Sequence, residues 1–309
     1  MKPVEDCYKK IKSNCFKFIF SQETRENKFK NKDRMLKKFL IPFCFWLESK
    51  INKQKPFILG LAGGQGTGKT TVTSIVKIIL TKYFNLKVFK ISIDDFYKTR
   101  KERLVLSKKI HPLLMTRGVP GTHDTKMISK FFKEVKKNKF TKIRVPKFDK
   151  SVDDRTSKNK WYKLSAKPDV IILEGWCVGA RAQSRSQLKK SINSLERTKD
   201  FNLKWRKFVN LKLQREYKNI FSQLNSLIYL QAKNFKILQQ WRIKQENKLW
   251  LNSKKKKNLK IMSKGDVINF MQTYQRITQN MFKDAPKYAS IIFKLDSKHQ
   301  INSATYRKK

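Results

Sequence analysis

Half of the glycines in this 309-residue chain lie in one short segment. Five of the ten glycines fall between Gly60 and Gly68, within the sequence FILGLAGGQGTGKTT. An apolar run leads into these glycines, and the apolar residues of the following sequence, KTTVTSIVKIIL, recur at helical spacing. The segment is therefore predicted to be a strand, a glycine-rich loop and a helix.

The loop matches the pattern G-x-x-x-x-G-K-[ST]. Glycine lets backbone N–H groups turn inward and cradle phosphate oxygens, which a Cβ atom would keep away. The pattern therefore predicts a nucleotide phosphate site rather than a merely flexible loop. In such a site Lys69 reaches the β- and γ-phosphates of ATP, and the Thr70 hydroxyl ligates Mg²⁺. The residues expected to hold the nucleotide are Gly63, Gly64, Gln65, Gly66, Thr67, Gly68, Lys69, Thr70 and Thr71.

Further strands alternate with helices along the chain. This alternation predicts an α/β fold of the P-loop type, with a mostly parallel sheet covered by helices on both faces. The expected strands are KVFKISI (87–93, reaching Asp94), KIRVP (142–146), DVIILEG (169–175), SLIYL (226–230) and a late edge strand, ASIIFKLD (289–296). The expected helices span about 124–137, 187–225 and 234–250, and a last one begins at Ser263 with a capping-box-like Asp266.

Residues 1–54 are predicted to form a helical extension ahead of a main domain at 55–309. The four cysteines have no metal-like spacing and indicate reduced structural thiols. The longest apolar run, FLIPFCFWL, is far shorter than the roughly 18 residues that suggest a membrane span. Neither a secretory signal nor a transit peptide is evident. We therefore expect a cytoplasmic protein that does not associate with membranes.

The chain is strongly basic, with 73 Lys and Arg against 23 Asp and Glu, a formal net charge of +50. Such a charge can attract nucleic acids or anionic substrates. The excess is mostly lysine, is spread from Lys2 to Lys309, and accompanies abundant Asn, Ile and Phe, all residues with A/T-rich codons. A solvated surface is therefore the favoured interpretation. The run KKKK at 254–257 is likewise interpreted as a linker.

Three carboxylates follow predicted strands at the sheet edge where open α/β sheets bind ligands. Asp94 and Asp95 follow the second strand, and either could cap the next helix or act in the site. Functionally, one would accept the proton of an attacking hydroxyl and the other would lie near the metal. Glu174 ends a buried apolar strand, where an unpaired charge is costly, so Mg²⁺ is its expected partner.

A series of motifs in order extends beyond the phosphate loop: SIDDFY, HPLLMTRGVPGTHD, VPKFDKS, ILEGW, QQWRIKQE and MSKGDVINFMQTY. With this series the chain resembles the D-glycerate 3-kinases of the plant and cyanobacterial type. These belong to the P-loop kinase group that includes uridine, pantothenate and phosphoribulo-kinases. The resemblance covers about residues 40–309.

The resemblance implies an ATP- and Mg²⁺-dependent kinase that phosphorylates D-glycerate, with the kinase domain at 55–309 and a helical lid at about 233–250. It implies Asp94 as catalytic base, Lys69 on the phosphates, Thr70 and Glu174 at the metal, and Arg242 as the lid arginine. The residues implicated on the acceptor side are Asp95, Tyr97, Arg117, His123, Asp124, Lys147, Asp149 and Lys150.

Several alternatives stay open at this point. His123 could be a structural hydrogen-bonding residue, and Arg242 could be one more solvated cation. The loop after DKS is shorter than in the relatives, which affects the role of Arg155. The acceptor could be a nucleoside or another hydroxylated metabolite, and a nucleotide-dependent nucleic-acid-binding protein is a rival of another class. The sequence leaves the oligomeric state open.

Overall fold

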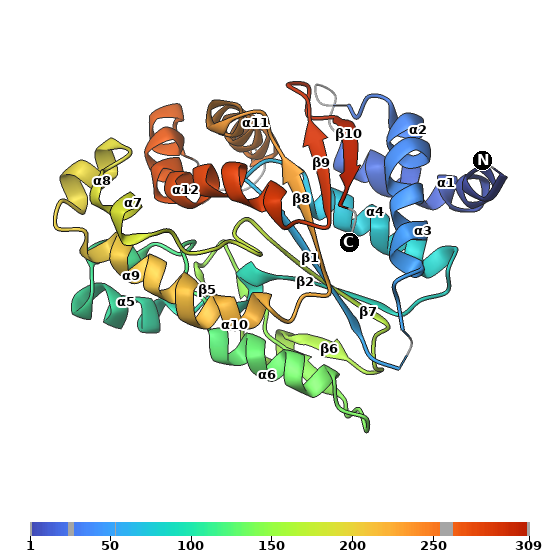
Figure 1. The fold of residues 1–309 in the computed structure, drawn as a ribbon, viewed down its shortest axis with the longest axis horizontal. Helices are drawn as coiled ribbons and strands as arrows, with labels where there is room; N and C mark the ends of the chain where they lie inside the picture. The colour runs from blue at the N-terminus through green and yellow to red at the C-terminus, as the bar shows by residue number, and fades with distance from the viewer. Residues whose placement is uncertain (1, 24–27, 53, 254–261, 308–309) are drawn as a thin grey trace.

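The computed structural model describes residues 2–23, 28–52, 54–253 and 262–307, and a six-stranded sheet forms its centre (Figure 1). The strand order is β10-β9-β8-β1-β7-β2. All neighbouring pairs are parallel except β9 with β10. The predicted α/β class with a mostly parallel sheet is confirmed. The strands of this sheet are β1 (Phe57–Gly63), β2 (Val88–Ser92), β7 (Val170–Gly175), β8 (Ser226–Gln231), β9 (Ile291–Leu295) and β10 (Ile301–Tyr306).

Helices cover both faces of this sheet (Figure 1). The N-terminal helices are α1 (Lys2–Gln22), α2 (Lys32–Arg34), η1 (Met35–Leu40) and α3 (Ile41–Glu48). Those between β1 and β7 are α4 (Lys69–Lys82), η2 (Ile93–Phe96), α5 (Arg100–Lys109), η3 (Pro112–Met115), α6 (Thr125–Val135) and η4 (Lys158–Lys160). Those after β7 are α7 (Arg185–Lys189), α8 (Ser194–Lys199), α9 (Lys204–Lys212), η5 (Leu213–Tyr217), α10 (Lys218–Phe221), α11 (Phe235–Ser253), α12 (Lys264–Asp284) and η6 (Ala285–Lys287).

Side-chain alternation along β1 divides the apolar core into two clusters. Leu59 and Leu61 point to one face and join residues of α1, α3, α4 and α11. Ile58 and Ala62 point to the other face and join residues of α6, α9 and α12. Because β1 is buried along its whole length, the end of the strand and the loop that follows it are held from both sides. Within residues 1–54, α1, η1 and α3 belong to the first cluster and contact α4, and Phe43 of α3 packs on Phe293 of β9.

Two strand expectations need correction. The segment 289–296 was expected to form an edge strand, but β9 lies between β8 and β10, and β10 is the edge. The sequence INSATY of β10 is mostly polar and only partly buried, so it lacks the apolar alternation that marks a strand. The strand at 142–146 exists as β3 (Ile143–Val145), but it pairs antiparallel with β6 (Tyr162–Leu164) outside the main sheet.

A second small hairpin joins β4 (Phe148–Asp149) to β5 (Asp154–Arg155). Between residues 187 and 225 the predicted helical stretch is present but is broken into short helices. The run at 254–257, interpreted as a linker, lies outside the described residues.

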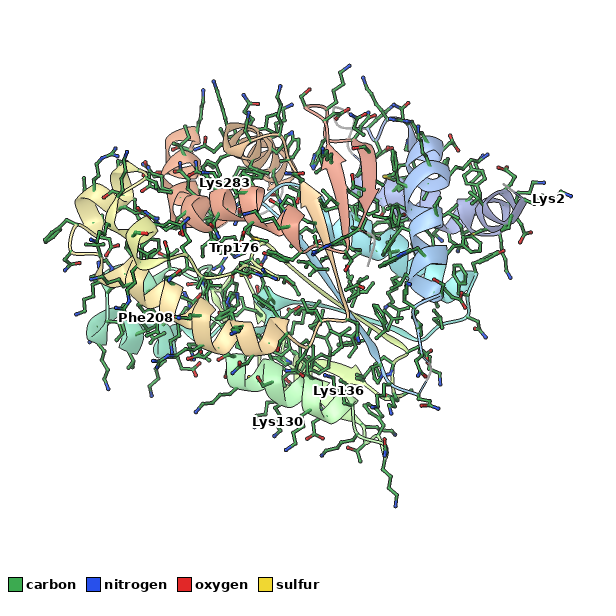
Figure 2. All side chains as sticks on the ribbon, viewed as in Figure 1. Lys2, Lys130, Lys136, Trp176, Phe208 and Lys283 are labelled. Atoms are coloured by element: carbon green, nitrogen blue, oxygen red, sulfur yellow. The ribbon has the colours of Figure 1, made fainter. Side chains whose placement is uncertain are left out.

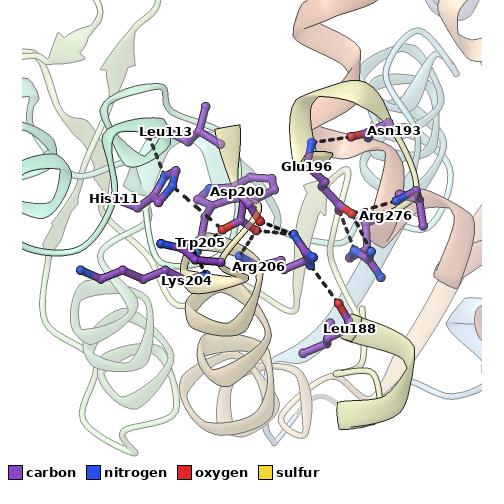
Figure 3. A network of polar contacts seen from close by, with 12 residues as sticks. His111, Leu113, Leu188, Asn193, Glu196, Asp200, Lys204, Trp205, Arg206 and Arg276 are labelled. Carbon is purple, nitrogen blue, oxygen red and sulfur yellow. Dashed lines mark hydrogen bonds and ion pairs between the residues drawn. The ribbon is translucent and has the colours of Figure 1, made fainter. Parts of the chain in front are cut away.

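Buried ion pairs tie α12 to the short helices that follow β7 (Figure 3). The Glu196 carboxylate accepts hydrogen bonds from Arg276 Nε and Nη2, both at 2.6 Å. Beside this pair, Asp200 accepts from Arg206 Nη1 at 2.8 Å, and His111 Nε2 lies 4.0 Å from Asp200. Buried ion pairs of this kind add geometric specificity more reliably than net stability. The Glu196–Arg276 pair fixes the position of α12, which also reaches the candidate active site.

The four cysteines are free and buried, as expected for structural thiols. Figure 2 shows long side chains with nitrogen tips projecting outward around the molecule, and Lys2 extends from the outer end of α1. Within the described part of the chain, no helix is both long enough and apolar enough to cross a membrane.

Candidate active site

The phosphate loop joins β1 to the start of α4, and α11 packs closely against it. Gly66 has φ +79°, and a Cβ atom there would lie 2.9 Å from Trp241 Cβ. A Cβ atom on Gly64 would lie 2.3 Å from Leu238 Cδ1. Both glycines therefore serve close packing against α11 as well as exposing backbone N–H groups. A side chain at either position would push the helix away from the loop.

Lys69 extends back over this loop at the start of α4. Its Nζ donates a hydrogen bond to the Gly64 carbonyl at 2.9 Å. Burial lowers the pKa of Lys69 to about 8, and the nearby carboxylates Glu174 and Asp94 partly oppose that shift. A cation that has lost hydration in this way is a strong partner for an anionic ligand, because phosphate oxygens would replace the lost water.

Glu174 lies at the end of β7, beside the first turn of α4. It accepts hydrogen bonds from Thr70 Oγ1 at 2.9 Å and from Thr73 Oγ1 at 2.6 Å, and it is 6% exposed. Hydroxyl and carboxylate oxygens are hard ligands of the type Mg²⁺ prefers, and Mg²⁺ commonly takes one or two carboxylates with phosphates and water. The residues present therefore fit Mg²⁺. Among the described residues, no group of three or more His, Cys, Asp or Glu side chains could hold a metal.

Asp94 and Asp95 lie in the short turn η2 after β2 and have different surroundings. Asp94 Oδ2 accepts from Lys150 Nζ at 2.6 Å. Burial raises the pKa of Asp94, but the Lys150 ammonium, with smaller contributions from His123 and the Tyr97 hydroxyl, lowers it by more, so the net pKa is lowered. Asp95 accepts from the backbone N–H groups of Ser92 and Phe148, each at 3.3 Å, and so completes the capping box of the turn, in which Ser92 is the N-cap. Burial raises the pKa of Asp95 to about 6.

These groups open onto one cavity of about 780 Å³ at the carboxyl edge of the sheet. The predicted site residues that line it are Gln65, Gly66, Gly68, Lys69, Thr70, Thr71, Asp94, Asp95, Tyr97, Arg117, Lys150, Glu174 and Arg242. The phosphate loop, the candidate base, the candidate metal carboxylate and the candidate lid arginine thus face a common space. A volume of this size is in the range of ligand sites.

Four residues expected on the acceptor side do not line this cavity. His123 is fully buried, stacks on Tyr97 with ring centroids 4.3 Å apart, and its Nδ1 lies 2.6 Å from Tyr217 Oη. Burial lowers the pKa of His123 to about 4, so it is neutral. Its surroundings match the structural alternative.

The other three have local roles. Asp124 caps α6 by accepting from Met127 N at 3.0 Å. Asp149 accepts from Ser151, and the Lys147 ammonium lies 5.7 Å from the Tyr162 ring centroid. Arg155, on the shortened loop, donates to the Tyr97 carbonyl at 2.8 Å and so supports the turn behind the site.

Arg242 projects from α11, the candidate lid helix, into the cavity. It pairs with Glu246 one turn later and donates to Gln245 Oε1 at 3.0 Å, while its buried Nε has no hydrogen-bond partner. Its guanidinium lies 6.0 Å from the ring centroid of Phe270 on α12. The side chain is therefore held at the cavity wall with one donor unsatisfied.

Several residues in or next to the cavity were not predicted from the sequence. Thr73 follows Thr70 by one turn of α4, so helical periodicity could have identified it as a second partner of Glu174. Tyr274 on α12 and Trp176 after β7 were predicted only as parts of larger motifs. His299 reaches the cavity from the β9–β10 turn and stacks on Trp241 with centroids 4.2 Å apart. No local pattern marks His299, because its position depends on the unpredicted strand β10.

Comparisons with known proteins find relatives among kinases. No protein-family model matches the chain. It is similar to the uncharacterized kinase mug58 of Schizosaccharomyces pombe, with 32% identity over 256 residues, covering 80% of this chain and 85% of the relative. It is 27% identical over 226 residues to the chloroplastic D-glycerate 3-kinase of Arabidopsis thaliana, covering 67% of this chain and 47% of the plant protein.

Among solved structures, a D-glycerate 3-kinase from Cryptococcus neoformans superposes with a TM-score of 0.70 at 23% identity. The superposition covers 87% of this chain and 97% of the fungal one. At this identity the likeness concerns the fold.

Proposed function

Because the chain belongs to the P-loop kinases of the group that includes D-glycerate 3-kinase and pantothenate kinase, we propose that it transfers the γ-phosphoryl group of ATP to D-glycerate. The products are 3-phosphoglycerate and ADP. The observation that carries the proposal is the shared cavity, which is lined by the phosphate loop, by the carboxylate Asp94 and by the guanidinium of Arg117. A small hydroxy acid presents a hydroxyl group to Asp94 and a carboxylate to Arg117.

On the nucleotide side, the backbone of the loop and Lys69 hold the phosphates of ATP. Mg²⁺, when bound, supplies positive charge that neutralises the phosphates and the charge developing on them. Thr70 and Glu174 are the protein groups that would hold it, and Thr73 orients the Glu174 carboxylate through its 2.6 Å hydrogen bond. Arg242, one turn before Glu246 on the lid, stabilises the transferring group when the lid closes.

On the acceptor side, Asp94 accepts the proton of the primary hydroxyl as that oxygen attacks phosphorus. Lys150 keeps Asp94 ionised in spite of burial, so the base is ready at neutral pH. The planar guanidinium of Arg117 matches a carboxylate and orients the acceptor, so that its hydroxyl is directed at the γ-phosphate.

The experiment that tests this proposal is ADP release measured over an acceptor panel. The panel contains D-glycerate, L-glycerate, glycerol, pantothenate and uridine, with ATP and Mg²⁺ present throughout and a reaction without acceptor as the blank. We expect D-glycerate to give the highest kcat/KM. Turnover with uridine or pantothenate and none with glycerate would overturn the glycerate assignment while leaving a kinase of the same group.

A further inference from the structure

A carboxylate next to the acceptor side of the cavity has no part in the reaction described above. Asp153 lies on the short loop between β4 and β5, with φ +56°. Its Oδ2 lies 3.0 Å from Arg103 Nη2, and its Oδ1 accepts from Arg117 Nη1. The carboxylate therefore lies between two guanidinium groups, one behind it in the core and one in front of it at the cavity.

The arginine behind Asp153 is Arg103, which is buried and held by several hydrogen bonds. Arg103, on α5, is fully buried and donates to the carbonyl oxygens of Met115 at 2.6 Å, Asp153 at 2.6 Å and Lys98 at 3.2 Å. It thus binds together the loop that carries Arg117 and the loop that carries Asp153. If Asp153 moved away, Arg103 would be a buried cation without its counter-charge, which is strongly unfavourable.

The arginine in front of Asp153 is Arg117, whose backbone is held in place and whose guanidinium has one edge with only a single long contact. Tyr274 Oη donates to the Arg117 carbonyl at 3.3 Å, and Trp176 Nε1 donates to the next carbonyl, that of Gly118, at 2.9 Å. The Arg117 guanidinium lies 5.5 Å from the Phe148 ring centroid. Its Nη2 makes a long contact of 3.5 Å with the Lys150 carbonyl, and within the described residues its Nε has no hydrogen bond. The Nε–Nη2 edge is therefore the one open to a ligand.

We propose that Asp153 is the positioning residue that determines acceptor specificity. Anchored by Arg103, it occupies the Nη1 side of Arg117 and leaves one bidentate edge for a single carboxylate. It also places a fixed negative charge beside that edge, which disfavours acceptors carrying a second anionic group such as a phosphate ester. The acceptor class is then an unphosphorylated hydroxy acid with one carboxylate. This inference rests on the proposed function, because it assigns a role at the same site.

The geometry indicates that the Asp153 carboxylate stays on Arg117 when the acceptor binds, rather than being displaced by the acceptor carboxylate. A substitute would have to leave Arg117 when the acceptor binds. Asp153 is held through both its side chain and its backbone carbonyl by the buried Arg103, so it stays in place. Removing its charge should therefore weaken acceptor binding by releasing Arg117, rather than strengthen it by removing a competitor.

The test compares Asp153→Asn with Asp154→Asn, which loses the same charge one residue later. Asp154 accepts from the backbone N–H of Arg100 at 3.1 Å and contacts neither Arg103 nor Arg117. We expect Asp153→Asn to raise the KM for D-glycerate at least about tenfold, with kcat within about threefold and the KM for ATP unchanged, as for loss of uniform binding. Asp154→Asn should resemble wild type.

Two further measurements separate positioning from general loop damage. Because Asp153 acts through Arg117, the double variant Arg117→Lys with Asp153→Asn should bind D-glycerate no more weakly than Arg117→Lys alone. Asp153→Asn should also bind 2-phosphoglycerate better relative to D-glycerate, because the carboxylate that repels the phosphate group is removed. The Ki of 2-phosphoglycerate divided by the KM of D-glycerate should therefore fall at least about tenfold. Melting curves of all variants check that they are folded.

The inference is overturned if the KM for D-glycerate in Asp153→Asn falls or stays within twofold of wild type, if the KM for ATP rises as much, or if the two substitutions add. If wild type rejects glycerate but uses another carboxylic acid, the glycerate assignment fails, and the same comparisons on that acid decide the role of Asp153. If wild type uses only acceptors without a carboxylate, both proposals fail.

Discussion

Replacing Lys150 by methionine tests how Asp94 is kept ionised. The Lys150 ammonium lies 2.6 Å from Asp94 Oδ2. A unit-charge pair about 4 Å apart is worth about 4 kcal/mol at an effective dielectric constant of 20, and one pKa unit corresponds to about 1.4 kcal/mol. The Lys150 side chain is 61% exposed, so solvent screens much of this interaction. We therefore expect Lys150→Met to raise the pKa of Asp94, by less than an unscreened pair of charges would give.

The sign follows from the two opposing effects on Asp94. Burial raises its pKa and Lys150 lowers it, with a net lowering in wild type. Without the ammonium, burial is opposed only by the weaker effects of His123 and the Tyr97 hydroxyl, so a larger fraction of Asp94 is protonated at a given pH. If Asp94 is the base, the acid limb of kcat/KM should move to higher pH. The assay is kcat/KM for the acceptor measured from about pH 4.5 to 9.

Two controls accompany this assay. Lys147→Met removes the same charge from a nearby exposed lysine whose ammonium faces the Tyr162 ring, and it should leave the limb in place. Asp95, with a pKa raised by burial to about 6, titrates in the same range, so the comparison is repeated in Asp95→Asn. An acid limb at the wild-type position in Lys150→Met, or an equal shift in Lys147→Met, would refute the reasoning, whatever happens to the height of the profile.

Three further predictions concern the lid, the metal carboxylate and the turn after β2. Arg242→Lys keeps the charge but loses the planar fork, so we expect kcat to fall more than about tenfold with ATP affinity and melting temperature nearly unchanged. Lys236→Ala on the same helix is the control, and an equal fall there contradicts the lid role. Thr73→Val removes a 2.6 Å hydrogen bond to Glu174, and we expect the half-saturating Mg²⁺ concentration to rise about tenfold or more. An unchanged Mg²⁺ titration contradicts that. Asp95 has a folded pKa raised to about 6, so its contribution to stability is present below about pH 4 and lost as the pH rises through 6. Asp95→Asn should therefore gain in melting temperature relative to wild type between pH 4 and 7, and a loss over that range refutes the assignment.

The parts of the fold that the sequence predicted are those with a strong local pattern. The phosphate loop combines an apolar strand, spaced glycines and an amphipathic helix, and each element appears at its predicted place. Glu174 was identifiable because a charge that ends a buried apolar strand needs a partner, and the structure gives it two hydroxyl partners. The strand β10 was missed because it is an edge strand with a mostly polar, only partly buried sequence.

The acceptor side could be predicted only to the level of its loops. Which residues of a loop face the cavity depends on tertiary contacts. His123 lies behind Tyr97, while Arg117, six residues earlier, faces the cavity. Asp153 reaches Arg103 and Arg117 across 50 and 36 residues of sequence, and no spacing rule connects such partners. A resemblance in motif order identifies these loops but not the direction of each side chain.

The central claim, phosphoryl transfer to the primary hydroxyl of a small hydroxy acid, is tested most directly by identifying the product. Wild type and Asp94→Asn are incubated with ATP, Mg²⁺ and D-glycerate, and the products are resolved by phosphorus NMR and mass spectrometry. The account predicts 3-phosphoglycerate in amounts equal to the ADP formed by wild type, and a rate lowered about a hundredfold to ten-thousandfold in Asp94→Asn. Phosphate on the secondary hydroxyl, ADP without a phosphorylated acid, or an equal rate in Asp94→Asn would contradict it.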